Sequence, residues 1–405
     1  MDFGYDARTE ELRAELLSFM DSHIYPAETR PGGVVEGAPL DWERPAVMTT
    51  LRAEARARGL WNLFLPDEHH GAGLTTLQYA PLAEIMGRSP ALAPEATNCA
   101  APDTGNMELL HLFGTAEQQE RWLEPLLDAR IRSAFCMTEP DVASSDASNI
   151  ATSIRRDGDD YVLDGRKWWS TGIMSPDCAL LVVLGVSDPD ASPRGRFSIV
   201  LVPRDTPGVR VVRGLSVFGY TDADHGGHGE VVFDGVRVPA SNVLGEEGAG
   251  GLLTQARLGP GRIHHCMRLI GMAERAFELM CRRADERATF GRPLADHGTV
   301  MGWIADARVR IDQLRLLVLR AAWLIDEQGA RAARTEISAI KIAAPQTVEW
   351  VIDKAIQVHG AAGVSQDTPL AGLWTHARGL RFADGPDEVH RMVLARHELK
   401  RLRQG

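Results

Sequence analysis

The chain has 405 residues, 44% hydrophobic and 24% charged, which is typical of a globular protein of two or three domains. Its formal net charge of −11 argues against non-specific binding to nucleic acid or to an anionic membrane. The five cysteines are scattered and no C-x-x-C occurs, which predicts free thiols rather than a disulfide or zinc framework. The sequence has no signal-like N-terminus and no apolar run of about 18 residues. We therefore expect a cytoplasmic protein without a membrane or nucleic-acid partner.

Residues 7 to about 130 show helical periodicity. We expect helices over Thr9–Met20 with Thr9 as N-cap, Trp42–Arg58, Thr76–Met86 and Asn106–Phe113, and a capping box joining Thr115 to Gln118. His69 and His70 are adjacent in a polar turn. Adjacent histidines without a helical i,i+4 partner are more often solvated than ligating, so the sequence predicts no metal site.

From about Ile131 the pattern changes to short β-rich runs separated by turns. The runs are Tyr161–Ser170, Ala179–Gly185, Phe197–Val202, Val209–Arg213 and Gly229–Pro239. This spacing is typical of an antiparallel sandwich or barrel. No G-x-G-x-x-G lies between a strand and a helix, which argues against a dinucleotide-binding βαβ unit. We expect the Gly-rich residues 248–251 to form a turn.

Long helices return after about Gly250. We expect them over Arg262–Arg287, Val300–Gln328, Thr335–Gly360 and Val389–Leu402. The predicted fold is thus α+β. It has an N-terminal helical domain (1–130), a middle antiparallel β-sandwich or barrel (131–245) and a C-terminal four-helix bundle (246–405).

Asp384 stands immediately before Gly385-Pro386, near the end of the chain. Gly-Pro stops a preceding helix, and Asp387 and Glu388 favour the N-terminus of the next one. Taken alone, Asp384 is best interpreted as a helix cap on a turn.

Five motifs change that interpretation. Phe135-Cys-Met-Thr-Glu-Pro-Asp-Val-Ala-Ser-Ser-Asp146 resembles the flavin loop of the acyl-CoA dehydrogenase family, and Lys167-Trp-Trp-Ser-Thr-Gly172 resembles its second flavin strand. Arg287–Leu294, Gln357–Gly363 and the stretch around Asp384 follow in the family's order and spacing. The resemblance covers nearly the whole chain. It is strongest to the subfamily that in animals is fused to a kinase-like domain.

The resemblance implies the acyl-CoA dehydrogenase fold and FAD-dependent α,β-dehydrogenation of an acyl-CoA thioester to the trans-2-enoyl-CoA. Asp384 matches the base that takes the α-proton while hydride passes to flavin N5. The family usually has Glu at this position. Because Asp is one methylene shorter, the substrate must lie closer or the backbone must shift. An electron-transferring flavoprotein is the implied acceptor, fatty-acid β-oxidation the implied pathway, and a homodimer or homotetramer the implied assembly.

The resemblance also implies the residues that hold FAD. They are Phe135, Met137, Thr138, Ser144, Trp169, Ser170, Thr171 and Glu388, with Arg287, Phe290, Gln357, Val358, His359, Gly360 and Ala361 reaching the FAD of a neighbouring subunit. Taken alone, Arg287 fits a solvated helix end equally well. Because neighbours on a strand point to opposite faces, we expect one of Trp168 and Trp169 to lie in the core. Gly298 departs from the family, replacing a common flavin-contacting Gln.

The residues implied for substrate are Ser144, Arg262, Ala383 and Gly385. We expect Arg262 at the N-terminus of the first bundle helix, where glycines allow close approach and the helix favours anions. Ala383 replaces a bulky aromatic residue, which suggests a branched, cyclic or bulky acyl group. His264 and His265 could titrate nearby, although histidines within a helix are more often structural.

Three alternatives stay open at this point. An acyl-CoA oxidase would use the same residues but react with oxygen. A reduced-flavin monooxygenase needs no α-proton base, so the carboxylate at Asp384 argues against it. A non-catalytic scaffold that has lost flavin is disfavoured because Thr138, Trp169, Arg287 and Asp384 are all present.

Overall fold

A computed structural model of the chain describes residues 4–28, 46–193 and 195–404. Two compact units can be distinguished by their internal contacts. The helical unit comprises Met1–Pro26, Gly73–Pro94 and Arg262–Gly405, and the β unit comprises Ala27–Ala72 and Glu95–Gly261. The residues expected to form an N-terminal helical domain are therefore shared between the two units. The boundaries at 130/131 and 245/246 stay a prediction.

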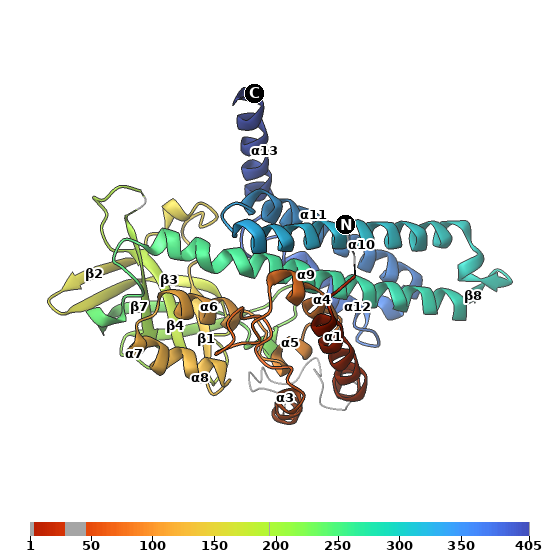
Figure 1. Cartoon of the computed structure of the whole chain (residues 1–405), viewed down its shortest axis with the longest axis horizontal. Helices are drawn as coiled ribbons and strands as arrows, with labels where there is room; N and C mark the ends of the chain where they lie inside the picture. The colour runs from red at the N-terminus through yellow and green to blue at the C-terminus, as the bar shows by residue number, and fades with distance from the viewer. Residues whose placement is uncertain (1–3, 29–45, 194, 405) are drawn as a thin grey trace. The chain divides into compact units, whose positions relative to one another are not determined.

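The β unit is built on a seven-stranded sheet in the order β1-β4-β2-β3-β7-β6, with β5 also pairing with β4 (Figure 1). Its strands are β1 (Arg132–Cys136), β2 (Ser153–Asp157), β3 (Asp160–Thr171), β4 (Cys178–Val186), β5 (Phe197–Pro203), β6 (Val209–Leu215) and β7 (His228–Pro239). The pairs β2/β3, β3/β7, β6/β7 and β4/β5 are antiparallel, as expected. The pairs β1/β4 and β2/β4 are parallel, which the sequence did not predict because alternation of side chains carries no strand direction.

Short helices complete the β unit. They are α3 (Val47–Ala57), α6 (Asp103–Phe113), α7 (Ala116–Gln118) and α8 (Glu124–Leu127), while α2 (Tyr25–Glu28) and α5 (Ala93–Ala96) lie where the chain passes between units. The predicted capping box is confirmed, since Thr115 and Gln118 satisfy each other's backbone N–H groups. Of the helix expected over Trp42–Arg58, the first residues lie outside the described part of the chain.

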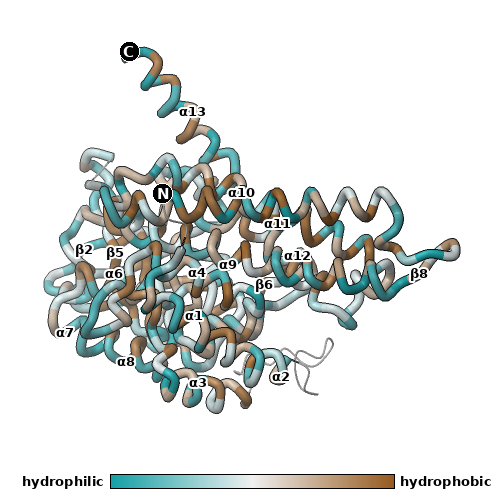
Figure 2. Tube along the Cα trace, turned by 45° about the vertical axis from the view of Figure 1, so that its right-hand side comes forward, coloured by the Kyte–Doolittle hydropathy of each residue, from teal (hydrophilic) through white to brown (hydrophobic). Residues whose placement is uncertain are grey.

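The helical unit contains the four predicted long helices. Its elements are α1 (Ala7–Phe19), α4 (Thr76–Gly87), the part of α9 (Gly250–Glu286) from residue 262 onward, α10 (Gly298–Gln328), α11 (Arg334–His359), α12 (Leu370–Gly379), α13 (Asp387–Gln404) and a hairpin of β8 (Ala288–Thr289) and β9 (Arg292–Pro293). Along α10 and α11, hydrophobic and hydrophilic residues alternate within the turns (Figure 2), and buried residues of α10 such as Ile311, Leu314 and Val318 recur every three or four positions. This is the stripe pattern of helices buried on one face.

Two helix starts differ from the sequence prediction. The N-cap of α1 is Asp6, whose carboxylate accepts from the Thr9 N–H, so Thr9 lies inside the helix. Helix α9 begins at Gly250 and continues through Pro260. Residues 250 and 251 are therefore helical. Arg262 lies inside a long helix rather than at its N-terminus, and the expected anion-binding helix end is absent there.

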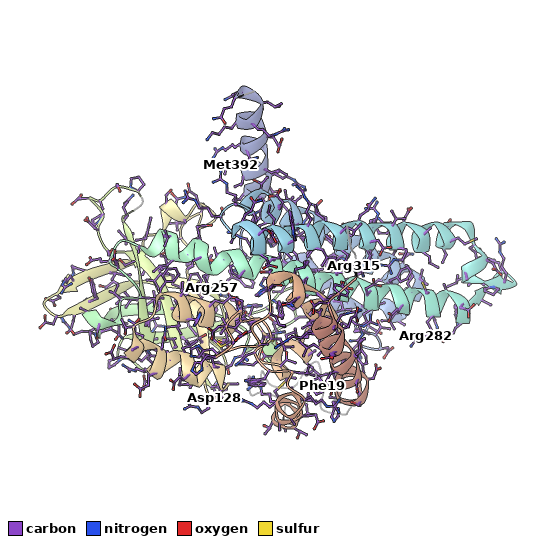
Figure 3. All side chains as sticks on the ribbon, viewed as in Figure 1. Phe19, Asp128, Arg257, Arg282, Arg315 and Met392 are labelled. Atoms are coloured by element: carbon purple, nitrogen blue, oxygen red, sulfur yellow. The ribbon has the colours of Figure 1, made fainter. Side chains whose placement is uncertain are left out.

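Within the helical unit, α4 and α9 approach so closely that side chains cannot fit between them. A Cβ added at Gly271 would lie 1.8 Å from the Glu84 carbonyl oxygen. Beside this contact, Glu84 and Glu274 form ion pairs with Arg315 of α10 (labelled in Figure 3), and Glu274 also pairs with Arg308. Backbone contact and charge network together fix this part of α9.

All five cysteines are free thiols, as predicted, and only Cys281 is not fully buried. Among the described residues, no helix has the length and apolar character needed to span a membrane.

Candidate active site

Asp384 lies on the turn between α12 and α13 and has a left-handed backbone, with φ of +56°. Asp is one of the few residues other than glycine that adopts this conformation without a large cost. Gly385 follows with φ of +106°, and a Cβ there would meet the His390 imidazole at 3.2 Å. Non-glycine residues in this region persist where the surroundings hold them, commonly at functional sites.

Two cations hold the backbone of this turn. The buried ammonium of Lys341 donates to the carbonyl oxygens of Leu380 (2.7 Å) and Ala383 (2.8 Å). Arg262 donates through Nε to the carbonyl oxygen of Asp384 at 3.0 Å. Burial lowers the pKa of both cations, while the Asp384 carboxylate opposes that shift. Lys341 gave no signal in the sequence, because a single lysine in a helix is ordinary.

The start of α13 agrees with the predicted helix-end charges. Asp387 is the first residue of α13 and is almost fully buried, accepting from Arg381 and Gln346 at 2.9 Å. Glu388 is exposed and pairs with Arg391. Asp387 thus ties the turn to α11, whereas Glu388 faces solvent.

The two adjacent histidines of α9 have different surroundings. The ring of His264 packs edge-on against Tyr79 with centroids 4.9 Å apart, and burial lowers its pKa to about 3. His265 instead places Nε2 3.7 Å from Oδ2 of Asp384. His264 fits the structural role predicted for a helical histidine, while the position of His265 was not foreseen.

In the β unit, a buried ion pair anchors the flavin-loop motif. Lys167 of β3 is fully buried and donates to Glu139 Oε1 (2.8 Å) and to the Met137 carbonyl oxygen (2.9 Å). Glu139 also accepts from the N–H groups of Ala151 and Thr152. Burial alone would raise the pKa of Glu139, but the Lys167 ammonium and these hydrogen bonds outweigh it and lower that pKa. The pair closes both ends of the loop onto β3.

The other loop residues have mixed roles. Ser144 accepts from the Glu139 N–H at 2.9 Å, so its hydroxyl braces the loop from within. Thr138 is half-buried, and its carbonyl oxygen accepts from the Trp168 N–H. Phe135 lies at the end of β1, where the Arg257 guanidinium stands 4.3 Å from its ring centroid.

Neither Trp168 nor Trp169 lies in the core, so the expectation that one of them must is wrong. Trp168 is half-buried, and Trp169 is 39% exposed with a left-handed φ of +52°. The pairing of β3 with β7 slips in register between Lys167 and Ser170. This bulge breaks the alternation on which the prediction relied. The buried Nε1 of Trp168 has no hydrogen-bond partner among the described residues.

Beyond the tryptophans, Ser170 is fully buried and Thr171 joins a polar chain. The Thr171 hydroxyl lies 2.9 Å from Nδ1 of His228, whose Nε2 is 3.3 Å from Asp222. Burial alone would raise the pKa of Asp222, but His225 and His228 outweigh it and hold it well below its usual range. The hydroxyl of Thr171 is therefore oriented by a charged network.

A second buried carboxyl lies near Arg257, the residue whose guanidinium stands over the Phe135 ring. Glu108 of α6 is buried, and burial raises its pKa to about 8 despite the opposing charge of Arg257. Arg257 (labelled in Figure 3) donates to the side-chain oxygen of Asn106 at 3.1 Å. Oε2 of Glu108 has no hydrogen-bond partner among the described residues. A single Glu in an amphipathic helix gave no sequence signal for this environment.

The polar turn that carries His69 and His70 lies beside two further groups, Asp67 and His111. His111 of α6 joins Asp67 and His70, with potential ligand atoms all within 4.8 Å of one another. Asp67 also accepts from the N–H groups of His69 and His70. The side chains are partly exposed, and the hydrogen bonds of the turn account for the positions of Asp67 and His70.

The residues expected to reach a neighbouring subunit lie on exposed parts of the helical unit. Phe290 is 99% exposed at the tip of the β8–β9 hairpin, with φ of +50°. Arg287 follows the last residue of α9. At the end of α11, Gln357, Gly360 and Ala361 are exposed, Val358 is buried, and His359 bonds the Ala355 carbonyl oxygen. Gly298 begins α10 and has open space around it.

Three family models match the chain in order. They describe the acyl-CoA dehydrogenase N-terminal domain (residues 6–130), middle domain (134–236) and C-terminal domain (248–399). The chain belongs to the acyl-CoA dehydrogenase family. This family consists of FAD-dependent oxidoreductases, and its fold of N-terminal helices, middle β domain and C-terminal helices confirms the predicted fold class.

Similar proteins come from bacteria and animals. Probable acyl-CoA dehydrogenase FadE2 of Mycobacterium tuberculosis is 55% identical over 402 residues, covering 99% of this chain and 98% of that protein. Acyl-CoA dehydrogenase family member 11 of Rattus norvegicus is 51% identical over 98% of this chain, which spans about half (51%) of the relative's length. A solved Mycobacterium abscessus structure assigned to the same family matches with a TM-score of 0.94 and 52% identity, covering 99% of this chain and all of that one.

Proposed function

We propose that this member of the family dehydrogenates acyl-CoA thioesters at the α,β position, with Asp384 as the base that takes the α-proton. The observation that carries the proposal is the turn itself. It presents a carboxylate from a left-handed backbone whose carbonyl oxygens are held by Arg262 and Lys341. An N-cap residue has an extended backbone and needs no cations at the carbonyl oxygens of its turn, so the turn differs from a cap of α13.

The β unit offers groups suited to an isoalloxazine ring. Trp169 is exposed, and the buried Nε1 of Trp168 has no partner among the described residues. The loop carrying Met137 and Thr138 is anchored by Lys167. A large planar ligand would cover the aromatic surface and use the half-buried loop groups. We infer that these residues, with Phe135, Ser144, Ser170 and Thr171, hold FAD.

FAD, when bound, would supply the hydride acceptor that the side chains of this protein lack. In the reaction, the α C–H bond breaks and its proton goes to the Asp384 carboxylate. The electron pair of the broken α C–H bond forms the α,β double bond, while the β-hydrogen leaves as hydride with the electron pair of its own C–H bond. The fixed turn keeps the Asp384 carboxylate in position while the proton transfers.

Asp384→Asn tests the assignment of the base. We expect the holoenzyme variant to stay yellow while anaerobic bleaching by acyl-CoA falls at least about 10²-fold, the typical contribution of a general base. Asp384→Glu should retain part of the rate, and Asp353→Asn, at an exposed ion pair on α11, should match wild type. Bleaching of Asp384→Asn at the wild-type rate would show that Asp384 is not the base.

We infer further that electrons leave to an electron-transferring flavoprotein and that the protein forms a homodimer or homotetramer. Phe290 on the hairpin tip is the residue to test, because its ring is 99% exposed and would bury apolar surface on association. Phe290→Ser should weaken association in analytical ultracentrifugation. Slow reoxidation of the reduced enzyme by air supports a dehydrogenase, whereas rapid reoxidation would favour an oxidase.

The small exposed Ala383 beside Asp384 supports a bulky or branched acyl group as substrate. A panel of straight, branched and cyclic acyl-CoA thioesters, scored by anaerobic bleaching, tests this. Ala383→Phe should slow the bulky substrates more than the straight ones.

A further inference from the structure

His265 and Asp384 come from distant parts of the chain and meet in the helical unit. Nε2 of His265 lies 3.7 Å from Oδ2 of Asp384, and both side chains are mostly buried, with 16% and 13% exposed. The separation is longer than a hydrogen bond and too short for a water molecule between the two atoms. Catalytic hydrogen bonds in ligand-free enzymes are often long and tighten when substrate binds.

The other ring nitrogen of His265 fixes where its proton lies. Nη2 of Arg268, one helical turn further along α9, is 3.2 Å from Nδ1 of His265. A guanidinium can only donate, so Nδ1 must accept. The proton of the neutral imidazole is then on Nε2, the nitrogen that faces Asp384.

The surroundings keep this imidazole neutral. Burial lowers the pKa of His265 well below its usual value, and the nearby Arg268, Lys341, His376 and His264 reinforce that shift. These groups come from α9, α11 and α12, and Asp384 faces the ring from the turn. A neutral ring with one N–H is a hydrogen-bond donor of fixed direction.

The bonds from Lys341 and Arg262 are made to carbonyl oxygens and hold the backbone of the turn, whereas Nε2 of His265 faces a carboxylate oxygen of Asp384. We propose that His265 is the positioning residue for the base: its Nε2–H, directed by Arg268, hydrogen-bonds the Asp384 carboxylate and turns the second oxygen toward the substrate. This rests on the proposed function, since it assumes that Asp384 is the base. A shorter carboxylate has more need of such support, because it cannot extend to find the proton.

Kinetics of the holoenzyme test the proposal. His265→Leu should lower the saturating rate of anaerobic flavin bleaching by about 10- to 100-fold, as expected for a misplaced reacting group. The half-saturating acyl-CoA concentration should stay within about twofold, because the ring contacts the base rather than the substrate. His265→Gln, whose amide can place an N–H near the position of Nε2, should recover much of the rate.

His264→Leu is the matched control, since it removes the adjacent buried ring that packs on Tyr79. We expect it to bleach at close to the wild-type rate. Equal losses in His264→Leu and His265→Leu would overturn the proposal, because general loosening of α9 would then explain both. Wild-type bleaching by His265→Leu, or no recovery in His265→Gln, would also overturn it.

A spectroscopic readout keeps the proposal testable if His265→Leu folds poorly. Two-bond ¹⁵N–¹H spectra of histidine-labelled wild type, with the His265 signals assigned from His265→Gln, report the protonated nitrogen. We expect a neutral Nε2–H ring across the range from about pH 5.5 to 8, where an unperturbed histidine would titrate. A ring protonated on Nδ1, or one that titrates normally, overturns the proposal.

Failure here can be separated from failure of the proposed function. If Asp384→Asn bleaches like wild type, the base assignment falls, and the role of His265 falls with it. If Asp384→Asn is inactive while His265→Leu is as fast as wild type, Asp384 remains the base and only the positioning role is lost.

Discussion

Glu108 gives the sharpest test of the electrostatics of the β unit. Its carboxyl is buried on α6, Oε2 has no hydrogen-bond partner among the described residues, and Arg257 is the nearby opposite charge. Arg257 is also engaged by Asn106 and by the ring of Phe135. Burial dominates, and the pKa of Glu108 rises from 4.5 to about 8.

The sign follows from proton linkage. A carboxyl whose pKa is higher in the folded protein binds its proton more tightly there, so stability falls as pH rises from the unfolded value toward the folded one. A shift from 4.5 to about 8 corresponds to roughly 5 kcal/mol when the pH is well above 8. Between about pH 5 and pH 8, wild type should lose roughly 3 kcal/mol through this group alone.

Glu108→Gln removes the titration and keeps the shape of the side chain. Urea denaturation of wild type and variant, followed by tryptophan fluorescence at about pH 5 and about pH 8, measures the difference. The free energy of unfolding of the variant, relative to that of wild type, should rise by roughly 3 kcal/mol between about pH 5 and about pH 8, and the two proteins should differ little at about pH 5. A stability gap that is the same at both pH values would refute the reasoning, since it would mean that Glu108 ionises normally in the folded protein.

Three further outcomes are expected. Gly271→Ala should destabilise the protein by roughly 2 kcal/mol or more, because the added Cβ would meet the Glu84 carbonyl oxygen. Gly302→Ala on α10 has open space around it and should stabilise the protein by roughly 0.5–1 kcal/mol. Thermal unfolding measures both variants, and shifts of the same sign would contradict this account. Lys167→Met should release the flavin loop, seen as faster hydrogen exchange in residues 137–152, and unchanged protection would count against the anchor. The buried carboxylate of Glu95 pairs with Arg52 and Arg132, and its pKa is lowered to about 2. It should therefore add roughly 3 kcal/mol to the free energy of unfolding above pH 4.5, and this contribution should be lost as pH falls toward 2. Glu95→Gln should make the free energy of unfolding depend less on pH in this acidic range.

Helix and strand positions followed well from the sequence where periodicity was strong. The long helices α10 and α11 begin and end within a few residues of the prediction, since each repeats an apolar stripe over many turns. The start of α9 was missed because Pro260 and its flanking glycines favour a break. Helix α12 was not predicted at all, being short and close to the turn that carries Asp384.

The proposed site residues rest on motifs. The resemblance implied roles for Asp384 and the flavin loop, and these stay predictions, whereas the residues that hold them in the structure gave no such signal. Lys341 and Lys167 are single lysines whose partners are carbonyl or carboxylate oxygens far away in sequence. His265 was noted, but its contact with Asp384 depends on how α9 packs against the turn. Such tertiary pairings leave no local pattern in one sequence.

The left-handed backbone at Asp384 bears on the proposed base, because the resemblance implies that most of the family has Glu at this position. At φ of +56°, a short polar side chain is tolerated far better than a longer one, because Asp can form hydrogen bonds close to its own backbone. Because the Asp side chain is shorter than Glu, the neighbouring residues must hold the turn close enough for the carboxylate to reach the α-proton. Lys341 and Arg262 bond the backbone of this turn, and His265 lies against the carboxylate. Asp384→Glu would therefore lengthen the base but strain the turn, and we expect it to bleach flavin faster than Asp384→Asn and slower than wild type.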